Sequence, residues 1–181
     1  MTGGGTGGHI NPELAIAKYI VKMNPDAKIA FAGAKRGMEE KLVPAEGFDL
    51  YTVDISGFKR SFKPAAMANN ISAAWRLMTT EGKAKKIVEN FDPYIVVGTG
   101  GYACYPYIKA AHNLGIPALL HESNALPGKA VMAAGKYSEK ILLGFPEAKD
   151  KIGSELAGKC IVTGNPIRSG MTAINKNEAK K

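Results

Sequence analysis

Residues 2–9 read Thr-Gly-Gly-Gly-Thr-Gly-Gly-His and contain the spacing G-x-G-x-x-G at Gly3, Gly5 and Gly8. Glycine lets the backbone turn tightly and lets N–H groups approach a ligand, and a helix that follows presents its positive end to an anion. The next residues, Asn-Pro-Glu at 11–13, predict a helix with Asn11 as N-cap and proline at the first helical position. The stretch therefore predicts an anion-binding loop that leads into a helix.

Short apolar runs alternate with helical patterns along the rest of the chain. The runs predict strands at 28–32, 50–55, 94–98, 117–121, 140–144 and 160–163. Further helices are predicted at about 37–46, 66–90 with a break near Gly82, 105–114 and 127–137. Continuous apolar strands separated by helices are typical of a parallel sheet covered on both faces. The predicted fold class is therefore α/β, with a doubly wound parallel sheet.

The start of the chain departs from a complete fold of this class. A buried strand in the middle of the sheet normally leads into the first glycine-rich loop, but here Met1 stands almost directly before Gly3. We therefore expect the first strand to be absent, as in a fragment or in a chain whose start is misplaced. At the other end, the chain stops soon after the loop motif Gly-Asn-Pro-Ile-Arg at 164–168, where a second domain could begin.

Composition and charge narrow the class of protein. Apolar residues make up 45% and charged residues 22% of the 181 residues, which is typical of a globular chain. Lysine and arginine outnumber acidic residues by 24 to 16, and the net charge of +8 favours anionic partners. The basic residues form no recognisable nucleic-acid module, so no nucleic-acid partner is expected. Cys104 and Cys160 fit neither a disulfide framework nor a zinc pattern.

Two further features concern membranes and export. No apolar stretch approaches the roughly 20 residues that span a bilayer. The first nine residues, glycine and threonine for the most part, have no basic or apolar region of the kind found in secretion signals. Neither a transmembrane helix nor a signal peptide is therefore expected.

The glycine loop alone does not identify the ligand. An NAD site needs an acid at the end of the next strand, but residues 33–36 read Gly-Ala-Lys-Arg, which speaks against NAD and would tolerate the extra phosphate of NADP. No Gly-Lys-Ser/Thr follows, so the loop is not a nucleotide-binding P-loop. An NADP-binding oxidoreductase domain is therefore one alternative.

Polar residues follow two further predicted strands. Gly-Thr-Gly-Gly-Tyr occupies 98–102, and His-Glu-Ser-Asn occupies 121–124. In α/β sheets ligands bind at the carboxyl ends of the strands. We therefore expect His9, the loop at 98–102, and His121 with Glu122 and Asn124 to converge on one site.

Taken together, the motifs at 3–10, 98–102, 121–124 and 164–168, in this order and at these intervals, resemble one family closely. It is the family of peptidoglycan glycosyltransferases that add N-acetylglucosamine to undecaprenyl-diphospho-N-acetylmuramoyl-pentapeptide, converting lipid I to lipid II. The resemblance runs from residue 2 to about residue 170. It implies a Rossmann-like, amino-terminal domain of a two-domain GT-B enzyme. Residues 1–164 would be the acceptor-side domain, and residues 165–181 the start of a linker and a charged tail. The donor-binding domain would be absent.

The resemblance also implies roles for individual residues. His9 matches the family histidine often considered as the general base, and Glu122 remains an alternative base. The glycine loops would hold the acceptor diphosphate, and the residues that match the family's contacts to the sugar nucleotide UDP-N-acetylglucosamine are Thr6, Gly7, Gly8, Asn124 and Arg168. The implied substrate-binding residues are Thr6, Gly7, Gly8, Gly100, Gly101, Tyr102, Asn124 and Arg168. The sequence has no acidic cluster typical of a bound metal, and no cofactor is expected. The reaction would proceed with inversion and would serve cell-wall synthesis, cell shape and cell division.

Residues 56–78 interleave basic and large apolar side chains. Met67, Ile71, Trp75 and Met78 fall on one helical face. Such a face, rimmed by cations, would dock on anionic lipid, although a buried core face would show the same pattern. The expected membrane patch consists of Lys59, Arg60, Phe62, Lys63, Ile71 and Trp75. It would place the protein peripherally on the cytoplasmic face of the bacterial cell membrane. A further alternative is an inactive fragment that only binds the lipid acceptor or the membrane.

Overall fold

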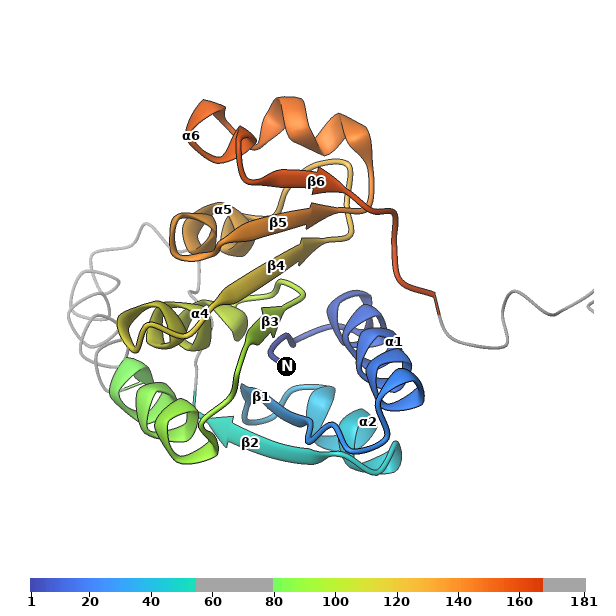
Figure 1. The fold of residues 1–181 in the computed structure, drawn as a ribbon, viewed down its shortest axis with the longest axis vertical. Coiled ribbons are helices and arrows are strands. Elements are labelled where there is room, and N and C mark those ends of the chain that lie inside the picture. The colour runs from blue at the N-terminus through green and yellow to red at the C-terminus, as the bar shows by residue number, and fades with distance from the viewer. Residues whose placement is uncertain (55–79, 168–181) are drawn as a thin grey trace, which may run out of the picture.

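A computed structural model describes residues 1–54 and 80–167 of the chain. Parallel strands alternate with helices in these residues (Figure 1). The elements of the first half are α1 (Gly7–Met23), β1 (Ala30–Ala34), α2 (Glu39–Ala45), β2 (Asp49–Val53) and a helix over 80–91. Those of the second half are β3 (Val96–Gly98), α4 (Cys104–Asn113), β4 (Ala118–Glu122), α5 (Lys129–Ala134), η1 (Gly135–Tyr137), β5 (Lys140–Leu143), η2 (Pro146–Lys151), α6 (Ser154–Ala157) and β6 (Cys160–Val162).

The sheet is parallel and has two parts. β1 pairs with β2, and β3, β4, β5 and β6 pair in that order. In Figure 1, α1 lies on one side of the strands and α4 with helix 80–91 on the other. This arrangement confirms the predicted Rossmann-like α/β sheet with helices on both faces.

The first two residues join the two parts of the sheet. Thr2 forms parallel bridges with Ala32 on one side and with Gly98 on the other. Its N–H donates to Val97 O at 2.7 Å, and the Ala32 N–H donates to Met1 O at 2.9 Å. The amino terminus accordingly lies between β1 and β3 (Figure 1). This is the central position from which the sequence predicted a strand to be missing, and two residues occupy it.

Two apolar clusters pack against the sheet. The larger one gathers residues from helix 80–91, α4 and α5 around β3, β4 and β5, with Ile108, Leu120 and Ile141 fully buried. The smaller one packs Ile10 and Leu14 of α1 against Phe31. The larger cluster also contains Val53 of β2 and packs against Ala32 of β1, so the two parts of the sheet share it.

Several predicted boundaries were wrong. Helix α1 begins at Gly7 with Thr6 as N-cap, not after Asn11, and Pro12 lies inside it. Proline there removes one intrahelical hydrogen bond, but the early start is supported by the burial of Ile10 and by a hydrogen bond from Thr99 Oγ1 to His9 O at 2.8 Å. Sequence periodicity does not contain such long-range contacts.

Other differences are smaller. Strand β1 begins at Ala30, two residues later than predicted, and β4 extends to Glu122, so this residue ends a strand and does not follow it. Helix 80–91 passes through Gly82 without the predicted break. The short helices η2 and α6 were not predicted, because six and four residues are too few to show a helical period. In the described parts of the chain, no helix is long and apolar enough to cross a membrane.

Candidate functional site

The candidate site lies at the edge of the sheet where the strands have their carboxyl ends, and the glycine-rich loops follow these strand ends. Loop 2–6 follows the bridge residue Thr2 and leads into α1, and loop 99–103 follows β3 and leads into α4. Loop 123–128 follows β4, and residues 163–167 follow β6. Because all strands are parallel, these loops share one edge (Figure 1). The three polar segments therefore lie at the same edge of the sheet, and that they form one ligand site stays a prediction.

The first two loops are packed backbone against backbone. Gly101 has φ 78°, and a Cβ at this position would overlap the carbonyl oxygen of Gly4. Gly5 has φ 87°, and a Cβ there would lie 2.9 Å from the Tyr102 ring. Side chains rarely adopt such positive φ angles. Glycine is therefore required here both for the turn and for the close approach of one loop to the other.

His9 lies between these two loops. It is half-buried in the first turn of α1, and its Nδ1 lies 3.1 Å from the carbonyl oxygen of Thr99. A carbonyl only accepts hydrogen bonds, so Nδ1 carries the hydrogen in the neutral ring and Nε2 keeps its lone pair. Among the described residues Nε2 has no hydrogen-bond partner. The arrangement leaves an imidazole nitrogen able to accept a proton at the strand edge.

The buried carboxylate of Glu39 holds the backbone of the first glycine loop against the end of β1. Its Oε2 accepts the Gly5 N–H at 3.1 Å, and its Oε1 accepts the Ala34 N–H at 3.0 Å. Glu39 is 1% exposed. In a dinucleotide site the glycine-loop N–H groups face the pyrophosphate of the cofactor, whereas here a side-chain carboxylate takes the Gly5 N–H. A fixed negative charge in this place repels a dinucleotide phosphate, which speaks against the NADP alternative.

A second buried carboxylate, Glu122, organises the third loop. Its Oε1 accepts both the backbone N–H and the side-chain amide of Asn124 at 2.8 Å, and its Oε2 accepts the Gly128 N–H at 2.7 Å. Glu122 is 2% exposed, whereas Asn124 is exposed. Three donors on two oxygens make Glu122 a fixed acceptor, and they hold the Asn124 amide against it.

His121 ties the third loop to the last one. It is 1% exposed, its Nε2 lies 3.2 Å from Gly164 O, and its Nδ1 lies 3.2 Å from the Ser123 hydroxyl. Burial lowers the pKa of His121, while the Gly164 carbonyl opposes that shift. The neutral ring thus donates to Gly164 and accepts from Ser123. Asn165 adds a hydrogen bond to Ser123 O at 3.1 Å. These bonds give His121 a structural position.

Sequence reasoning did not single out Glu13 and Glu39. Glu13 lies in α1 behind the first loop, where a Cβ on Gly3 would come within 2.8 Å of its Oε2. Burial raises the pKa of Glu13 to about 8, with the Met1 ammonium opposing and Glu39 adding to the shift. Its Oε1 has no hydrogen-bond partner. Both acids stand at ordinary helix positions in the sequence, so only their burial against glycines reveals them.

The predicted site residues fall into two groups. The described ones lie at the same strand edge, on the loops and helix starts given above: Thr6, Gly7, Gly8, His9, Gly100, Gly101, Tyr102, Glu122 and Asn124. Arg168 and the whole expected membrane patch, Lys59, Arg60, Phe62, Lys63, Ile71 and Trp75, lie outside the described residues. Within 1–54 and 80–167, no three His, Cys, Asp or Glu side chains come together in a way that could hold a metal ion.

Sequence relatives match all or nearly all of the chain. A protein of Acetivibrio thermocellus named UDP-N-acetylglucosamine–N-acetylmuramyl-(pentapeptide) pyrophosphoryl-undecaprenol N-acetylglucosamine transferase is 41% identical over 100% of this chain and 47% of its own length. A protein of the same name from Lactococcus lactis is 43% identical over 92% of this chain and 44% of its own length. The chain therefore spans about half the length of these curated relatives.

Solved structures with the same fold also match about half of their own chain to this one. The crystal structure of Acinetobacter baumannii MurG matches 95% of this chain and 46% of its own chain, with a TM-score of 0.72 and 25% identity. A UDP-GlcNAc 2-epimerase of Methanocaldococcus jannaschii, at 16% identity and a TM-score of 0.64, shares the fold alone. Residues 1–143 match the glycosyltransferase family 28 N-terminal domain. With these motifs in these positions, the chain belongs to glycosyltransferase family 28.

Proposed function

We propose that this chain is the acceptor-side part of an inverting N-acetylglucosaminyltransferase. The donor would be UDP-N-acetylglucosamine, and the acceptor would be the 4-hydroxyl of the muramoyl sugar in undecaprenyl-diphospho-N-acetylmuramoyl-pentapeptide. The support comes from the relatives' names and from the four motifs at one strand edge. Since the chain spans about half of those relatives, the sugar nucleotide would be bound largely by a second domain.

The single observation that carries this proposal is the state of His9. Its Nδ1–H is held by Thr99 O at 3.1 Å, so Nε2 is available to take the proton of the acceptor hydroxyl. The hydroxyl oxygen would then attack the anomeric carbon, and the bond to the UDP oxygen would break with its electron pair leaving on UDP. Histidine is the side chain that most often serves as a general base at neutral pH.

The glycine loops support binding of the acceptor diphosphate. The amino ends of α1 and α4 both follow glycine loops at the same edge. Helix amino ends and glycine-rich backbone attract phosphate groups through N–H groups and the helix dipole. Thr6, Gly7 and Gly8 stand at the start of α1, and Gly100 and Gly101 precede α4. Tyr102, 42% exposed above Gly5, would flank the bound group.

The two candidates for the general base, His9 and Glu122, differ in their hydrogen bonds. Both oxygens of Glu122 already accept hydrogen bonds from Asn124 and Gly128. We therefore assign Glu122 to positioning Asn124, and Asn124 to contact with the donor sugar. No cofactor enters the reaction proposed here, since proton transfer and leaving-group stabilisation need none.

The test joins this chain to the carboxyl-terminal half of the Acetivibrio thermocellus relative and measures transfer of labelled N-acetylglucosamine to a lipid I analogue. His9→Gln is expected to lower kcat by roughly 10²–10⁴-fold, the range for loss of a general base. His112→Gln is the matched control, because His112 is an exposed histidine of α4 beside Tyr137. Equal loss in both variants, or unchanged rates in His9→Gln, would refute the base assignment.

Two alternatives remain measurable in the same preparation. An inactive chain that only binds lipid would bind the lipid I analogue yet give a joined protein without transfer. An NADP-binding domain would bind NADPH tightly. Glu39→Gln tests the NADP alternative, because it replaces the carboxylate that lies against the glycine loop by an amide of the same shape. The measured quantity is the affinity for NADPH before and after the substitution.

We also propose peripheral attachment to the cytoplasmic face of an anionic membrane through the patch within 59–75. The net charge of +8 supports it, since each lysine or arginine near an anionic surface contributes about 1 kcal/mol. Co-sedimentation with anionic vesicles should fall in a Lys59→Glu, Lys63→Glu variant, and Trp75 emission should lose its blue shift. Lys149→Glu with Lys151→Glu, on η2, is the charge-matched control.

A further inference from the structure

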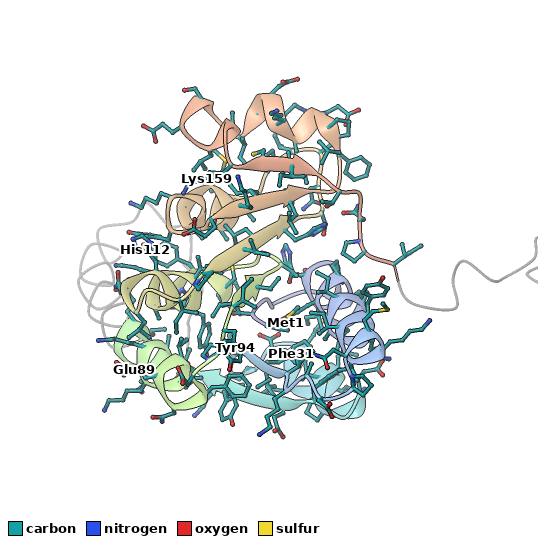
Figure 2. The ribbon with its side chains drawn as sticks, viewed as in Figure 1. Met1, Phe31, Glu89, Tyr94, His112 and Lys159 are labelled. Carbon is teal, nitrogen blue, oxygen red and sulfur yellow. The ribbon has the colours of Figure 1, made fainter. Side chains whose placement is uncertain are left out.

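The basic pair of Lys35 and Arg36 has no role in the transfer reaction proposed for this chain. Both residues follow β1, the strand that carries the Phe31 labelled in Figure 2, and both side chains are exposed. They open a turn, residues 35–38, that leads into α2. Neither cation forms a hydrogen bond or an ion pair with another residue that the structure describes. Two cations at the carboxyl end of a strand are therefore available to a ligand.

The backbone of this turn is fixed on two sides. The Lys35 N–H donates to Val53 O, at the end of β2, at 2.9 Å. The Ala34 N–H donates to the buried carboxylate of Glu39 at 3.0 Å. A Cβ on Gly37 would overlap the same carboxylate. The turn is thus wrapped around a buried group, and its shape does not depend on its exposed side chains.

Arg36 adopts a backbone conformation that arginine seldom takes. Its φ is 68°, in the left-handed region that favours glycine. Among the other non-glycine residues that the structure describes, only Asp92 has a positive φ, and aspartate enters this region more readily than arginine does. Strained backbone is concentrated at active sites and at residues that clamp ligands. The strain at Arg36 needs a reason beyond the turn, because glycine would make the same turn without strain.

The turn lies against the first glycine loop, residues 2–6. The Glu39 carboxylate that holds the turn also accepts the Gly5 N–H at 3.1 Å. The side chain of Met38 reaches the start of α1, since a Cβ on Gly7 would lie 3.9 Å from its methyl carbon. The two cations therefore stand next to the loop and the helix start at which we propose that the acceptor binds.

The order of the strands separates these cations from the donor side of the candidate site. Thr2 bridges β1 on one side and β3 on the other, and β4 pairs with β3. Along the edge of the sheet, the basic turn and the loop with Asn124 consequently lie on opposite sides of His9. Since Asn124 is assigned to the donor sugar, the part of the acceptor that extends from His9 away from the donor approaches Lys35 and Arg36.

We propose that Lys35 and Arg36 bind an oxyanion of the acceptor away from its reacting hydroxyl, and that they contribute to the choice of acceptor. The inference rests on the proposed function, whose acceptor carries anionic oxygens in its diphosphate and in the terminal carboxylate of its pentapeptide. A guanidinium binds the paired oxygens of either group through parallel N–H donors, and an ammonium adds a point charge. A turn that is already ordered presents both donors without the entropy cost of ordering a loop.

The joined protein of the transfer assay provides the first test. Lys35→Gln with Arg36→Gln should raise the KM for the lipid I analogue by roughly 10–100-fold, the range for loss of charge-assisted hydrogen bonds. The KM for UDP-N-acetylglucosamine and kcat should keep their parent values. Lys22→Gln with Lys86→Gln, on exposed positions of α1 and of helix 80–91, is the charge-matched control. An unchanged acceptor KM, or an equal rise in the control, would overturn the proposal, whereas a parent without any transfer would contradict the proposed function.

Binding of soluble acceptor fragments to the whole chain distinguishes the two anionic groups and does not depend on transfer. The probes are the muramoyl-pentapeptide without a diphosphate and the muramoyl diphosphate without a peptide, titrated in a calorimeter. The double variant should bind one probe about tenfold more weakly than the parent does, and the affected probe identifies the group that the cations bind. Equal affinities of parent and variant for both probes would contradict the proposal. Loss of affinity for NADPH alone would assign the pair to the NADP alternative instead.

Arg36→Gly separates binding from folding. Glycine adopts a φ of 68° without strain, so the Tm of this variant should equal or exceed that of the parent chain. Its KM for the acceptor should nevertheless rise, because the guanidinium is lost. A parent-like KM in Arg36→Gly would show that the arginine serves only the turn, and the assignment of Arg36 would then be wrong.

Discussion

The two parts of the sheet differ in how they are held together. Strands β3, β4, β5 and β6 pair continuously over one large apolar cluster, whereas β1 and β2 form a two-stranded part that packs on a smaller cluster and contributes only Val53 and Ala32 to the large one. The hydrogen-bonded backbone link of Met1 and Thr2 joins them, beside a cavity of about 600 Å³. The candidate site therefore spans the joint between the two parts, because His9 belongs to the smaller part and the loops after β3 and β4 belong to the larger one.

The largest effect is expected for a core truncation in the larger part. Leu120 is fully buried in β4. The substitution Leu120→Ala should lower the free energy of unfolding of the protein by about 2–5 kcal/mol. Hydrogen exchange should then accelerate throughout the chain. Leu14→Ala, in the smaller cluster, should accelerate exchange in α1, β1 and β2 before β4. Uniform acceleration by both variants would mean that the two parts unfold as one unit.

The next effect concerns the contact between the glycine loops. Gly101→Ala places a Cβ against the Gly4 carbonyl oxygen at φ 78°, so it should cost about 2–4 kcal/mol from backbone strain and overlap together. Gly115→Ala is the matched control, because Gly115 has φ 71° and open space around the new Cβ. It should cost about 1 kcal/mol. Equal costs, measured by chemical unfolding, would show that the loop contact contributes nothing.

A pH-dependent effect is expected at Glu13, on the α1 side of the joint. Its pKa is raised from its ordinary value of 4.5 to about 8 in the folded chain, so between these values the folded state holds a proton that the unfolded state has released. The stability of the parent chain should therefore fall as pH rises from about 4.5 to 8, by up to ~1.4 kcal/mol per pH unit from this group.

Glu13→Gln removes this titration while keeping the shape of the side chain. The variant should gain stability relative to the parent as pH rises from 5 to 8, with little difference at pH 4. Urea unfolding at several pH values measures it, with the exposed Glu139→Gln as control. A difference that does not vary with pH would contradict the buried, protonated state of Glu13.

The smallest effect is expected at the hydrogen bond that crosses the joint. Thr99 Oγ1 donates to His9 O at 2.8 Å, and Thr99→Val removes this donor with almost no change of shape. A loss of about 1 kcal/mol is expected, while Thr99→Ser keeps the hydroxyl and should lose less. His9 Nδ1 bonds to the backbone oxygen of Thr99, which both substitutions leave in place. The NMR chemical shifts of the His9 ring should therefore show the same tautomer in both variants as in the parent chain.

Much of the fold followed from local pattern. The apolar runs that predict strands lie within two residues of β1 to β6 at their starts, because buried parallel strands need continuous apolar side chains. Helix α4 was predicted within one residue at each end. The start of α1 was missed, since Asn11 and Pro12 carry the local signs of a helix start while a long-range bond to Thr99 supports the true one.

The sequence predicted which residues belong to the candidate site better than it predicted the role of each residue. His9, Tyr102 and Asn124 were identified because their motifs follow strand ends. Sequence reasoning kept Glu122 as an alternative base, whereas its three hydrogen bonds point to a positioning role. Glu13 and Glu39 were missed, because an acid in a helix is usually exposed and nothing in the local sequence distinguishes a buried one.

Local sequence pattern was enough to predict the parallel α/β class and the glycine-rich turns, because strand burial and positive φ angles constrain residue type locally. The folded structure was needed to show which nitrogen of His9 is free, which carboxylates are buried, and how Met1 and Thr2 bridge two parts of one sheet. These features depend on contacts between residues such as 9 and 99, or 2 and 97, which are distant in the sequence. Their energies arise when the chain brings the groups together and excludes water from them.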